Sequence, residues 1–419
     1  AGAAMRYALF HWGFHQWANF ALVGLSIAYV RFRMQRPGLI SETFRPLLGD
    51  RVDGARGHLI NILAVVSTVF GVATTLGLGV IQINSGLVSV SDVPFGANQQ
   101  LMILAGISMI FLVCALAPLE SGVRYISDVN MLLAGALLVF VFFAGPTDFI
   151  TAAMTNAIGD YFGNIMGMSL VMTPYTGDDW VERWTIFYWA WGLSWAPFVG
   201  SFIARISRGR TIREFVVGVI GMPVLLSVLW FSTFGGSALY FELFEGAALG
   251  NAVVQEMSSA LFATLALLPG AEIVSILMLV LIILFVITSA NSATFVLGMF
   301  TSKGVLTPSR WSRVTWGVIQ VLVAGVLLLS GGLAALQTIS IVAAFPFMIL
   351  MIFMAASLLR SLRTERRQQE LHEAMTRERL LRLLDRSDHL GESERPTEFD
   401  ELREELIEQV SQGESSRSE

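Results

Sequence analysis

Long uncharged runs alternate with short charged loops along most of this chain. Several of these runs exceed 18 residues, and about 20 apolar residues in a helix cross the hydrocarbon core of a membrane. The pattern therefore predicts an all-α, polytopic membrane protein. We expect about nine spans, over residues 8–30, 59–87, 101–118, 131–146, 184–204, 215–239, 273–290, 311–329 and 336–359.

The loops between these spans alternate in charge. Six arginines follow the first span and basic residues follow the fifth, seventh and ninth, whereas residues 147–183 and 240–256 are acidic. Because cytoplasmic loops carry an excess of Lys and Arg, this predicts a cytoplasmic C-terminus. With nine spans the N-terminus then lies outside. The chain does not begin with Met, so we expect it to start inside a longer protein that has an odd number of further spans upstream.

The composition changes near residue 360, which predicts a membrane domain over 1–359 and a cytoplasmic tail over 360–419. Residues 360–386 hold eight basic and five acidic residues, which suits a helix near anionic lipid. Residues 387–419 hold 11 acidic and three basic residues, which indicates a weakly ordered end. The charged helix is either a plain solvated tail or part of a sensor.

Composition agrees with this picture and excludes several functions. Hydrophobic residues make up 54% and charged residues 14% of the chain, with a mean hydropathy of +0.66. There is one cysteine, Cys114, the five histidines are scattered, and a basic nucleic-acid footprint is absent. Catalytic and nucleotide-binding motifs are also absent. We therefore expect neither an enzyme nor a cofactor, and an ion gradient as the energy source for uphill transport.

An aromatic-rich stretch, Trp184 to Glu214, stands out in the fifth span. Its uncharged part is followed by four arginines, four tryptophans crowd its first half, and Gly192 and Pro197 interrupt the middle. A broken, aromatic helix of this kind is typical of a ligand site at the bilayer midplane. The alternative is that the tryptophans are interfacial anchors.

The first span carries a second aromatic group. Trp12, Gln16 and Asn19 share one helical face, and Trp17 and Phe20 lie next to it. Aromatic rings from two spans could enclose a quaternary ammonium by cation–π attraction, worth about 2 kcal/mol or more for a desolvated ring. Interfacial anchoring and core packing remain the alternative.

Hydroxyl side chains recur in the second and seventh spans. Thr68 lies in the second and the adjacent Thr288 and Ser289 in the seventh. Sodium prefers oxygen ligands, although such hydroxyls also bond the backbone one turn back or join helices.

Taken together, these motifs resemble the betaine/choline/carnitine transporter family over nearly the whole chain up to about Arg360. The resemblance rests on the stretch 184–214, on His11-Trp12, on 70–82 and on 288–293. It implies a sodium-coupled glycine betaine carrier-like protein with a leucine-transporter-like inverted-repeat fold of twelve spans, of which helices 4 to 12 are present. The first three helices, including a glycine-rich broken one that binds the substrate carboxylate and part of the sodium site, are then missing.

The resemblance also implies a substrate site. Phe20 replaces a family tyrosine and Gly192 replaces a cage tryptophan, so we expect a bulkier or different zwitterion than glycine betaine. The implied substrate residues are Trp12, Trp17, Phe20, Trp189, Trp191, Gly192 and Trp195.

Two sodium sites are implied in the same way. Thr288 and Ser289 match one, and Thr68 and Phe198 match the other, where Val72 replaces a second threonine and offers no oxygen. Asn291 replaces an expected aspartate. The second site is therefore expected to be weak or absent.

The sequence as a whole favours a secondary transporter, a homotrimer in the bacterial inner membrane, that imports a quaternary-ammonium or related zwitterionic solute with Na⁺ by alternating access. The alternatives are a sodium-independent exchanger, a proton-coupled choline-type carrier, or a non-transporting membrane sensor.

Overall fold

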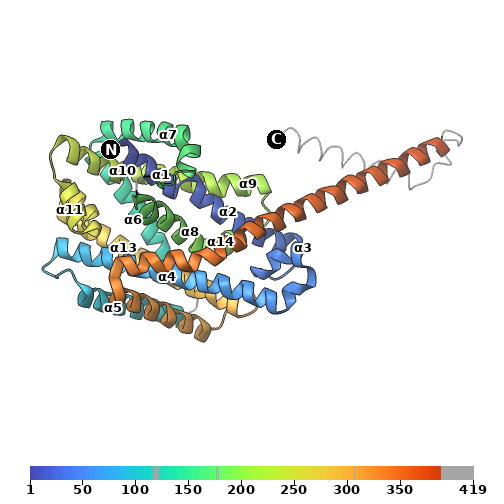
Figure 1. Cartoon of the computed structure of the whole chain (residues 1–419), viewed down its shortest axis with the longest axis horizontal. Helices are drawn as coiled ribbons and strands as arrows, with labels where there is room; N and C mark the ends of the chain where they lie inside the picture. Colours follow the sequence, from blue (N-terminus) through green and yellow to red (C-terminus); the bar gives the residue numbers. More distant parts are fainter. Residues whose placement is uncertain (117–121, 176, 178, 306, 388–419) are drawn as a thin grey trace. The chain divides into compact units, whose positions relative to one another are not determined.

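Helices account for nearly all of the regular structure in the computed structural model, which describes residues 1–116, 122–175, 177, 179–305 and 307–387 (Figure 1). The longer helices are α1 (Gly2–Trp12), α2 (Phe14–Ala28), α4 (Ala55–Val90), α5 (Ala97–Leu116), α6 (Gly122–Ala144), α7 (Thr147–Ser169), α8 (Phe187–Ile206), α10 (Met222–Phe244), α13 (Ala271–Thr301) and α14 (Arg310–Ser387). The shorter ones are η1 (Tyr29–Arg33), η2 (Ser41–Phe44), α3 (Arg45–Leu48), η3 (Gly49–Asp53), η4 (Glu182–Ile186), α9 (Ile212–Val216), η5 (Val217–Gly221), α11 (Leu249–Gln255), η6 (Met257–Ser259) and α12 (Ala260–Leu265). The chain divides into two units, Ala1–Ala355 and Ala356–Glu419. The end of the third expected span, residues 117–118, and nearly all of the acidic end of the tail, residues 388–419, lie outside the described residues.

Among the described residues, six helical segments are long and apolar enough to cross a membrane: Ala55–Val90, Ala97–Leu116, Tyr125–Ala144, Ile212–Phe244, Ala271–Thr301 and Arg310–Arg379. This confirms an all-helical, multi-pass membrane protein. The number is lower than nine for identifiable reasons. The expected first span is divided into α1 and α2, the expected fifth span, which contains α8, is not among the six segments, and the last two spans are counted together within α14. Within α14, Gly331 and Gly332 leave the helical conformation, and Gly332 has a φ of 55°.

The first span is broken at Gly13, between α1 and α2. A side chain at Gly13 would overlap the Leu9 carbonyl oxygen and lie 2.9 Å from the Tyr161 hydroxyl. The freed backbone N–H of Phe14 donates to that hydroxyl over 3.1 Å. Because a freed N–H inside a membrane needs a protein partner, Tyr161 of α7 stabilises the break.

The expected interruption of the fifth span at Gly192 and Pro197 is wrong, because α8 runs through both residues. A proline inside a membrane helix removes the backbone N–H that would bond the carbonyl one turn back, here that of Leu193, and this is tolerated where surrounding groups satisfy the freed carbonyl. The break is therefore in the first span rather than the fifth.

Small residues bring α2 and α8 close together. Gly192, Ala196, Gly200 and Ala204 are buried at four-residue spacing along α8, a pattern that allows membrane helices to approach closely. Gln16 lies against Gly192 and Val23 lies against Gly200, so the two helices run parallel.

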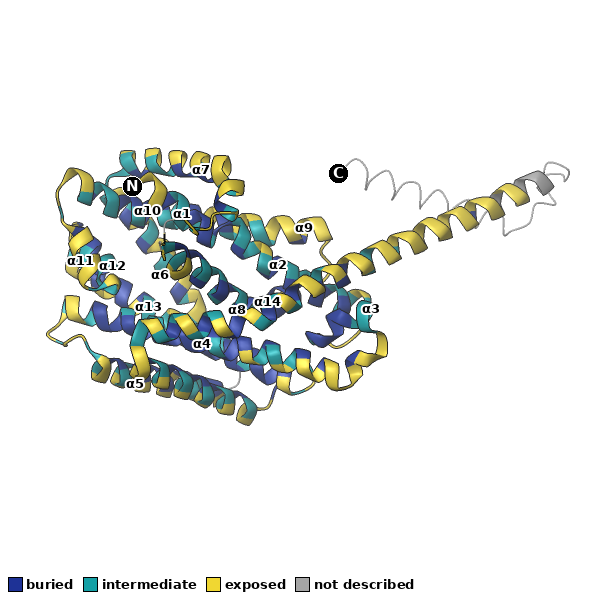
Figure 2. Ribbon diagram, viewed as in Figure 1, coloured by how far each residue is buried: buried dark blue, intermediate teal, exposed yellow. Residues whose placement is uncertain are grey.

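The other side of α8 packs against α4, which runs antiparallel to it because Gly71 lies against Ser194 while Thr75 bonds Trp191. In turn α4 packs against α13, with Gly79 against Val286. Figure 2 shows buried residues gathered on α4, α8 and α13 and exposed ones along α7 and α11. The centre of the first unit is thus built around α8 and α4.

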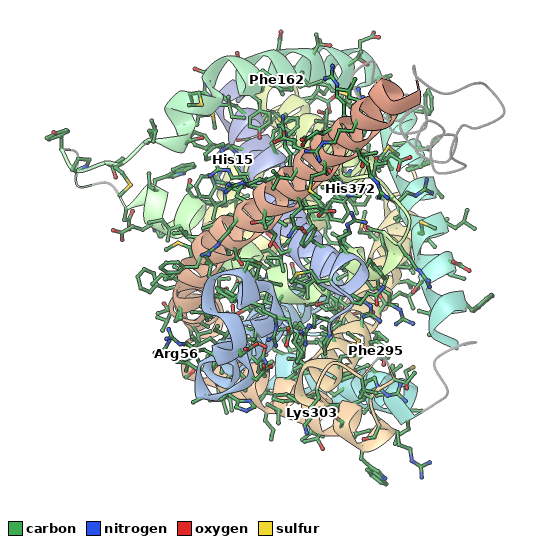
Figure 3. All side chains as sticks on the ribbon, turned by 90° about the vertical axis from the view of Figure 1, so that its right-hand side faces the viewer. His15, Arg56, Phe162, Phe295, Lys303 and His372 are labelled. Carbon is green, nitrogen blue, oxygen red and sulfur yellow. The ribbon has the colours of Figure 1, made fainter. Side chains whose placement is uncertain are left out.

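Two basic loops come together at one end of this unit. Gly304, next to Lys303, lies against Leu39 and Pro37 of the loop after α2, and Figure 3 looks onto the end that carries Arg56 and Lys303. Within the first loop, Arg45 donates to Glu42 over 2.8 Å and to Asp53 over 2.6 Å. The hydrogen bond from Arg45 lowers the pKa of the Asp53 carboxyl.

Candidate functional site

Two tryptophans from separate helices meet at the break in the first span. The ring of Trp12, the last residue of α1, lies 5.5 Å from that of Trp191 on α8, with the planes at 90°. Tyr188 and Phe231 also contact Trp12, at 5.8 and 6.2 Å, and Phe187 stacks on Trp191. Since Gly13 ends α1 directly after Trp12, the break sets the position of this ring. We call the contact between Trp12 and Trp191, with Tyr188 beside it, the aromatic pair site.

A single hydroxyl joins two of the predicted site tryptophans. Thr75 of α4 accepts hydrogen bonds from the indole N–H of Trp191 over 2.9 Å and of Trp195 over 3.0 Å. Trp195 also donates to the Gly71 carbonyl over 3.1 Å. The hydroxyl of Thr75 donates to that same carbonyl over 3.1 Å. The orientation of both rings is therefore fixed by α4.

Replacing Thr75 with valine is expected to lower both stability and solute affinity. The Trp191 N–H loses its partner, whereas Trp195 keeps Gly71. One unpaired buried donor costs about 1–3 kcal/mol, and a freer Trp191 ring should weaken binding about fivefold. The measurements are thermal unfolding and solute binding of the purified protein. Thr75→Ser keeps the hydroxyl and serves as the matched control, so equal losses in both variants would contradict the role of this oxygen.

The structure places three other predicted substrate residues away from the aromatic pair site. Trp17 packs edge-to-face on Phe20 at 5.3 Å, and Trp189 packs on His15 and Phe10 at 5.2 and 5.0 Å. Trp17 instead lines an open hollow of about 450 Å³ with residues of α8, α9 and the start of α10. Of the seven predicted residues, the structure brings together Trp12, Trp191, Gly192 and Trp195, while Trp17 and Phe20 join Trp195 in a neighbouring cluster.

An amide fills the space beside Gly192, where the family resemblance implied a tryptophan. A side chain at Gly192 would overlap the terminal atoms of Gln16 from α2. Gln16 is only 4% exposed, and its Oε1 has no hydrogen-bond partner among the residues that the structure describes. The absent ring at Gly192 therefore does not leave an empty wall.

Aromatic stacking continues from this site toward α1 and the segment before α8. His11 stacks on Tyr188 at 5.1 Å and is hydrogen-bonded to the Thr185 hydroxyl over 2.9 Å. His15 is hydrogen-bonded to the Ser169 hydroxyl over 2.9 Å. These contacts join α1, α2, α7 and α8 around the break at Gly13.

The predicted sodium residues form two separate groups. Thr288 and Ser289 are half-exposed on α13, and the Thr288 hydroxyl donates to the Leu284 carbonyl over 2.9 Å. Thr68 is fully buried and donates to the Ala64 carbonyl over 2.8 Å. A hydroxyl that donates keeps its lone pairs for a cation. In the described part of the chain no cluster of three His, Cys, Asp or Glu side chains could hold a metal ion.

Phe198 and Val72 belong to one buried cluster around α2, α4 and α8 that also contains Ala64. Phe198 packs on Trp195 at 5.3 Å, and Val72 is 1% exposed. Val72 therefore presents only methyl groups at the position where the second sodium site would need a threonine oxygen.

Sequence reasoning did not select Thr75, Gln16 or Tyr188 for the site. Thr75 is one of several hydroxyls in a long apolar helix, and Gln16 is an ordinary polar position between aromatic residues. The available signal was the helical face that the sequence pattern assigns to Trp12 and Gln16, which is only one turn long. Only the contacts with α4 and α8 show that these side chains lie beside the site.

A known family matches most of this chain, including the broken first span and α8. The model of BCCT, the betaine/carnitine/choline family transporters, matches residues 1–367. The chain belongs to the BCCT family. This BCCT protein is thus a member of a transporter family and not an enzyme.

Relatives of this BCCT protein are similar over most of its length. An ectoine/hydroxyectoine transporter of Virgibacillus pantothenticus is 47% identical over 363 residues, which cover 86% of this chain and 72% of that protein. A glycine betaine transporter of Bacillus subtilis is 49% identical over 378 residues, covering 90% and 73%. A probable glycine betaine transporter of Desulfitobacterium hafniense is 43% identical over 365 residues, covering 86% and 73%.

Proposed function

We propose that this BCCT protein imports a zwitterionic compatible solute of the betaine or ectoine type, coupled to Na⁺, by alternating access. The observation that carries the proposal is the edge-to-face contact of Trp12 and Trp191 at 5.5 Å beside the break at Gly13. Indole faces attract a cation by about 2 kcal/mol or more when water is excluded. The relatives that transport glycine betaine or ectoine support this solute class.

The proposal includes the finer architecture. The membrane domain, residues 1–359, would supply nine helices that correspond to helices 4 to 12 of an inverted-repeat fold with twelve spans. The tail, residues 360–419, would be cytoplasmic, and the protein would act as a homotrimer in the bacterial inner membrane. The gathering of two basic loops at one end supports a cytoplasmic position for that end.

For solute binding we assign direct contact to Trp12 and Trp191, with Trp195 and Gly192 beside them. Trp17, Phe20 and Trp189 would support this arrangement from the surrounding packing. Thr288 and Ser289 are the proposed sodium ligands, because two adjacent hydroxyls in an apolar helix supply the hard oxygens that Na⁺ prefers. Thr68 and Phe198 would form a second, weaker sodium site.

The deciding experiment is uptake of labelled glycine betaine and ectoine by the full-length protein in proteoliposomes, with and without an inward sodium gradient. We expect the solute concentration inside the vesicles to rise above the external concentration only when the sodium gradient is present. A Thr288→Val and Ser289→Ala double variant should lose this dependence. Equal uptake in both conditions would contradict sodium coupling, and no uptake of either solute would contradict the transport function.

The second candidate is sodium-independent exchange of one solute for another. It is favoured by Val72, which is buried and presents no oxygen beside Thr68. Loading the vesicles with unlabelled solute distinguishes the two functions. Exchange would be accelerated by internal solute and be unaffected by sodium.

A further inference from the structure

The amide of Gln16 takes the position that a side chain at residue 192 would occupy. The terminal atoms of Gln16 would overlap the β-carbon of any residue larger than glycine there. Gly192 follows Trp191 directly in α8, and Gln16 lies in the first turn of α2, just after the break that follows Trp12. The amide is therefore next to the aromatic pair site.

The oxygen of this amide is buried without a partner. Gln16 is 4% exposed, and its Oε1 has no hydrogen bond within the described structure. A buried acceptor without a donor costs about 1–3 kcal/mol, and membrane surroundings supply no water to satisfy it. The close packing of α2 on α8 explains why residue 192 is small, but it does not explain an unpaired oxygen at this position.

The arrangement separates two classes of zwitterion. A quaternary ammonium has no N–H and is attracted only by the indole faces. A cyclic amidinium also carries a delocalised positive charge, and its N–H groups donate hydrogen bonds. A donor from such a solute would satisfy the Gln16 oxygen while the ring lies against Trp12 and Trp191.

We propose that Gln16, seated over Gly192, is the specificity-determining residue of this carrier, and that it accepts a hydrogen bond from the N–H of a cyclic amidinium zwitterion of the ectoine type. The inference rests on the proposed function.

The test is competition binding on the full-length protein in detergent or proteoliposomes, with ectoine as the N–H donor and glycine betaine as the solute without one. Gln16→Met keeps the length of the side chain and removes the acceptor. We expect ectoine affinity to fall about tenfold, with glycine betaine affinity unchanged within about twofold. Gln82→Met is the matched control, since Gln82 donates to the Ser258 carbonyl far along α4 from the site. This variant should change the affinity for neither solute.

A second variant, Gln16→Ala combined with Gly192→Trp, replaces the amide with a ring. It should shift the preference toward glycine betaine and keeps the test valid if Gln16→Met folds poorly. If a folded Gln16→Met protein loses affinity for both solutes to the same degree, or for neither, the inference is overturned while the carrier function stays intact. If the wild-type protein binds neither solute, the proposed function fails and the inference fails with it.

Discussion

Replacing Trp191 with leucine is expected to weaken solute binding by about 30-fold or more. The Trp191 ring lies against Trp12 on one side and Phe187 on another, and Thr75 fixes its indole N–H. Leucine keeps an apolar side chain but offers no π-face to a cation. A desolvated cation–π contact is worth about 2 kcal/mol or more, and a difference of 2 kcal/mol is a factor of about 30 in affinity.

The measurement is the dissociation constant of the wild-type and Trp191→Leu proteins for the transported solute. Trp311→Leu provides the matched control, because Trp311 is 65% exposed near the start of α14. Trp191→Phe keeps a ring and loses only the bond to Thr75, so its affinity should lie between those of the wild-type and Trp191→Leu proteins. A Trp191→Leu protein that is folded and binds as tightly as the Trp311→Leu protein would contradict the assignment of this ring to the site.

Replacing Gly200 with leucine is expected to prevent α2 and α8 from packing together. A β-carbon at residue 200 would lie 2.7 Å from the side chain of Val23 and 2.9 Å from the backbone nitrogen of Gly24. The backbone cannot move aside as a flexible side chain can. Overpacking of this kind costs about 1–3 kcal/mol and occasionally more, and here it separates the two helices that carry the aromatic residues.

We expect the Gly200→Leu protein to be produced in low yield or to unfold at a clearly lower temperature, without transport. Size-exclusion chromatography and thermal unfolding in detergent measure this. Gly159→Leu is the matched control, since no atom of the described residues outside the helix's own backbone lies within 4 Å of a β-carbon at that position in α7. If the Gly200→Leu protein were as stable as the Gly159→Leu protein, the close approach of the two helices would not support the fold.

Much of the fold follows from the sequence, because span length and loop charge are local properties. The uncharged runs at residues 59–87 and 273–290 lie within α4 and α13. The break in the first span could not be predicted in this way. Gly13 depends on the Tyr161 hydroxyl, which is 147 residues away from Phe14 in the chain, and a glycine within an aromatic helix gives no local signal for such a partner.

The candidate site was predictable in part for the same reason. The aromatic residues stand out as types, so Trp12 and Trp191 could be selected before their contact was known. Their surroundings depend on three helices meeting. The sequence pattern identified Gly192 as an unusual position, but only the packing of α2 on α8 reveals that Gln16 fills it.

The parallel contact of α2 with α8 has a consequence for movement. A β-carbon at Gly24 would lie 3.3 Å from the Gly200 carbonyl oxygen and one at Gly200 would lie 2.9 Å from the Gly24 nitrogen, so the two backbones are in close contact and we expect these segments to move as one rigid rod. Conformational change during a transport cycle must then slide that rod against its neighbours. A pair of spin labels on α2 and α8 should keep a constant separation, while labels that report on α8 and α4 should shift when the carrier opens to the other side.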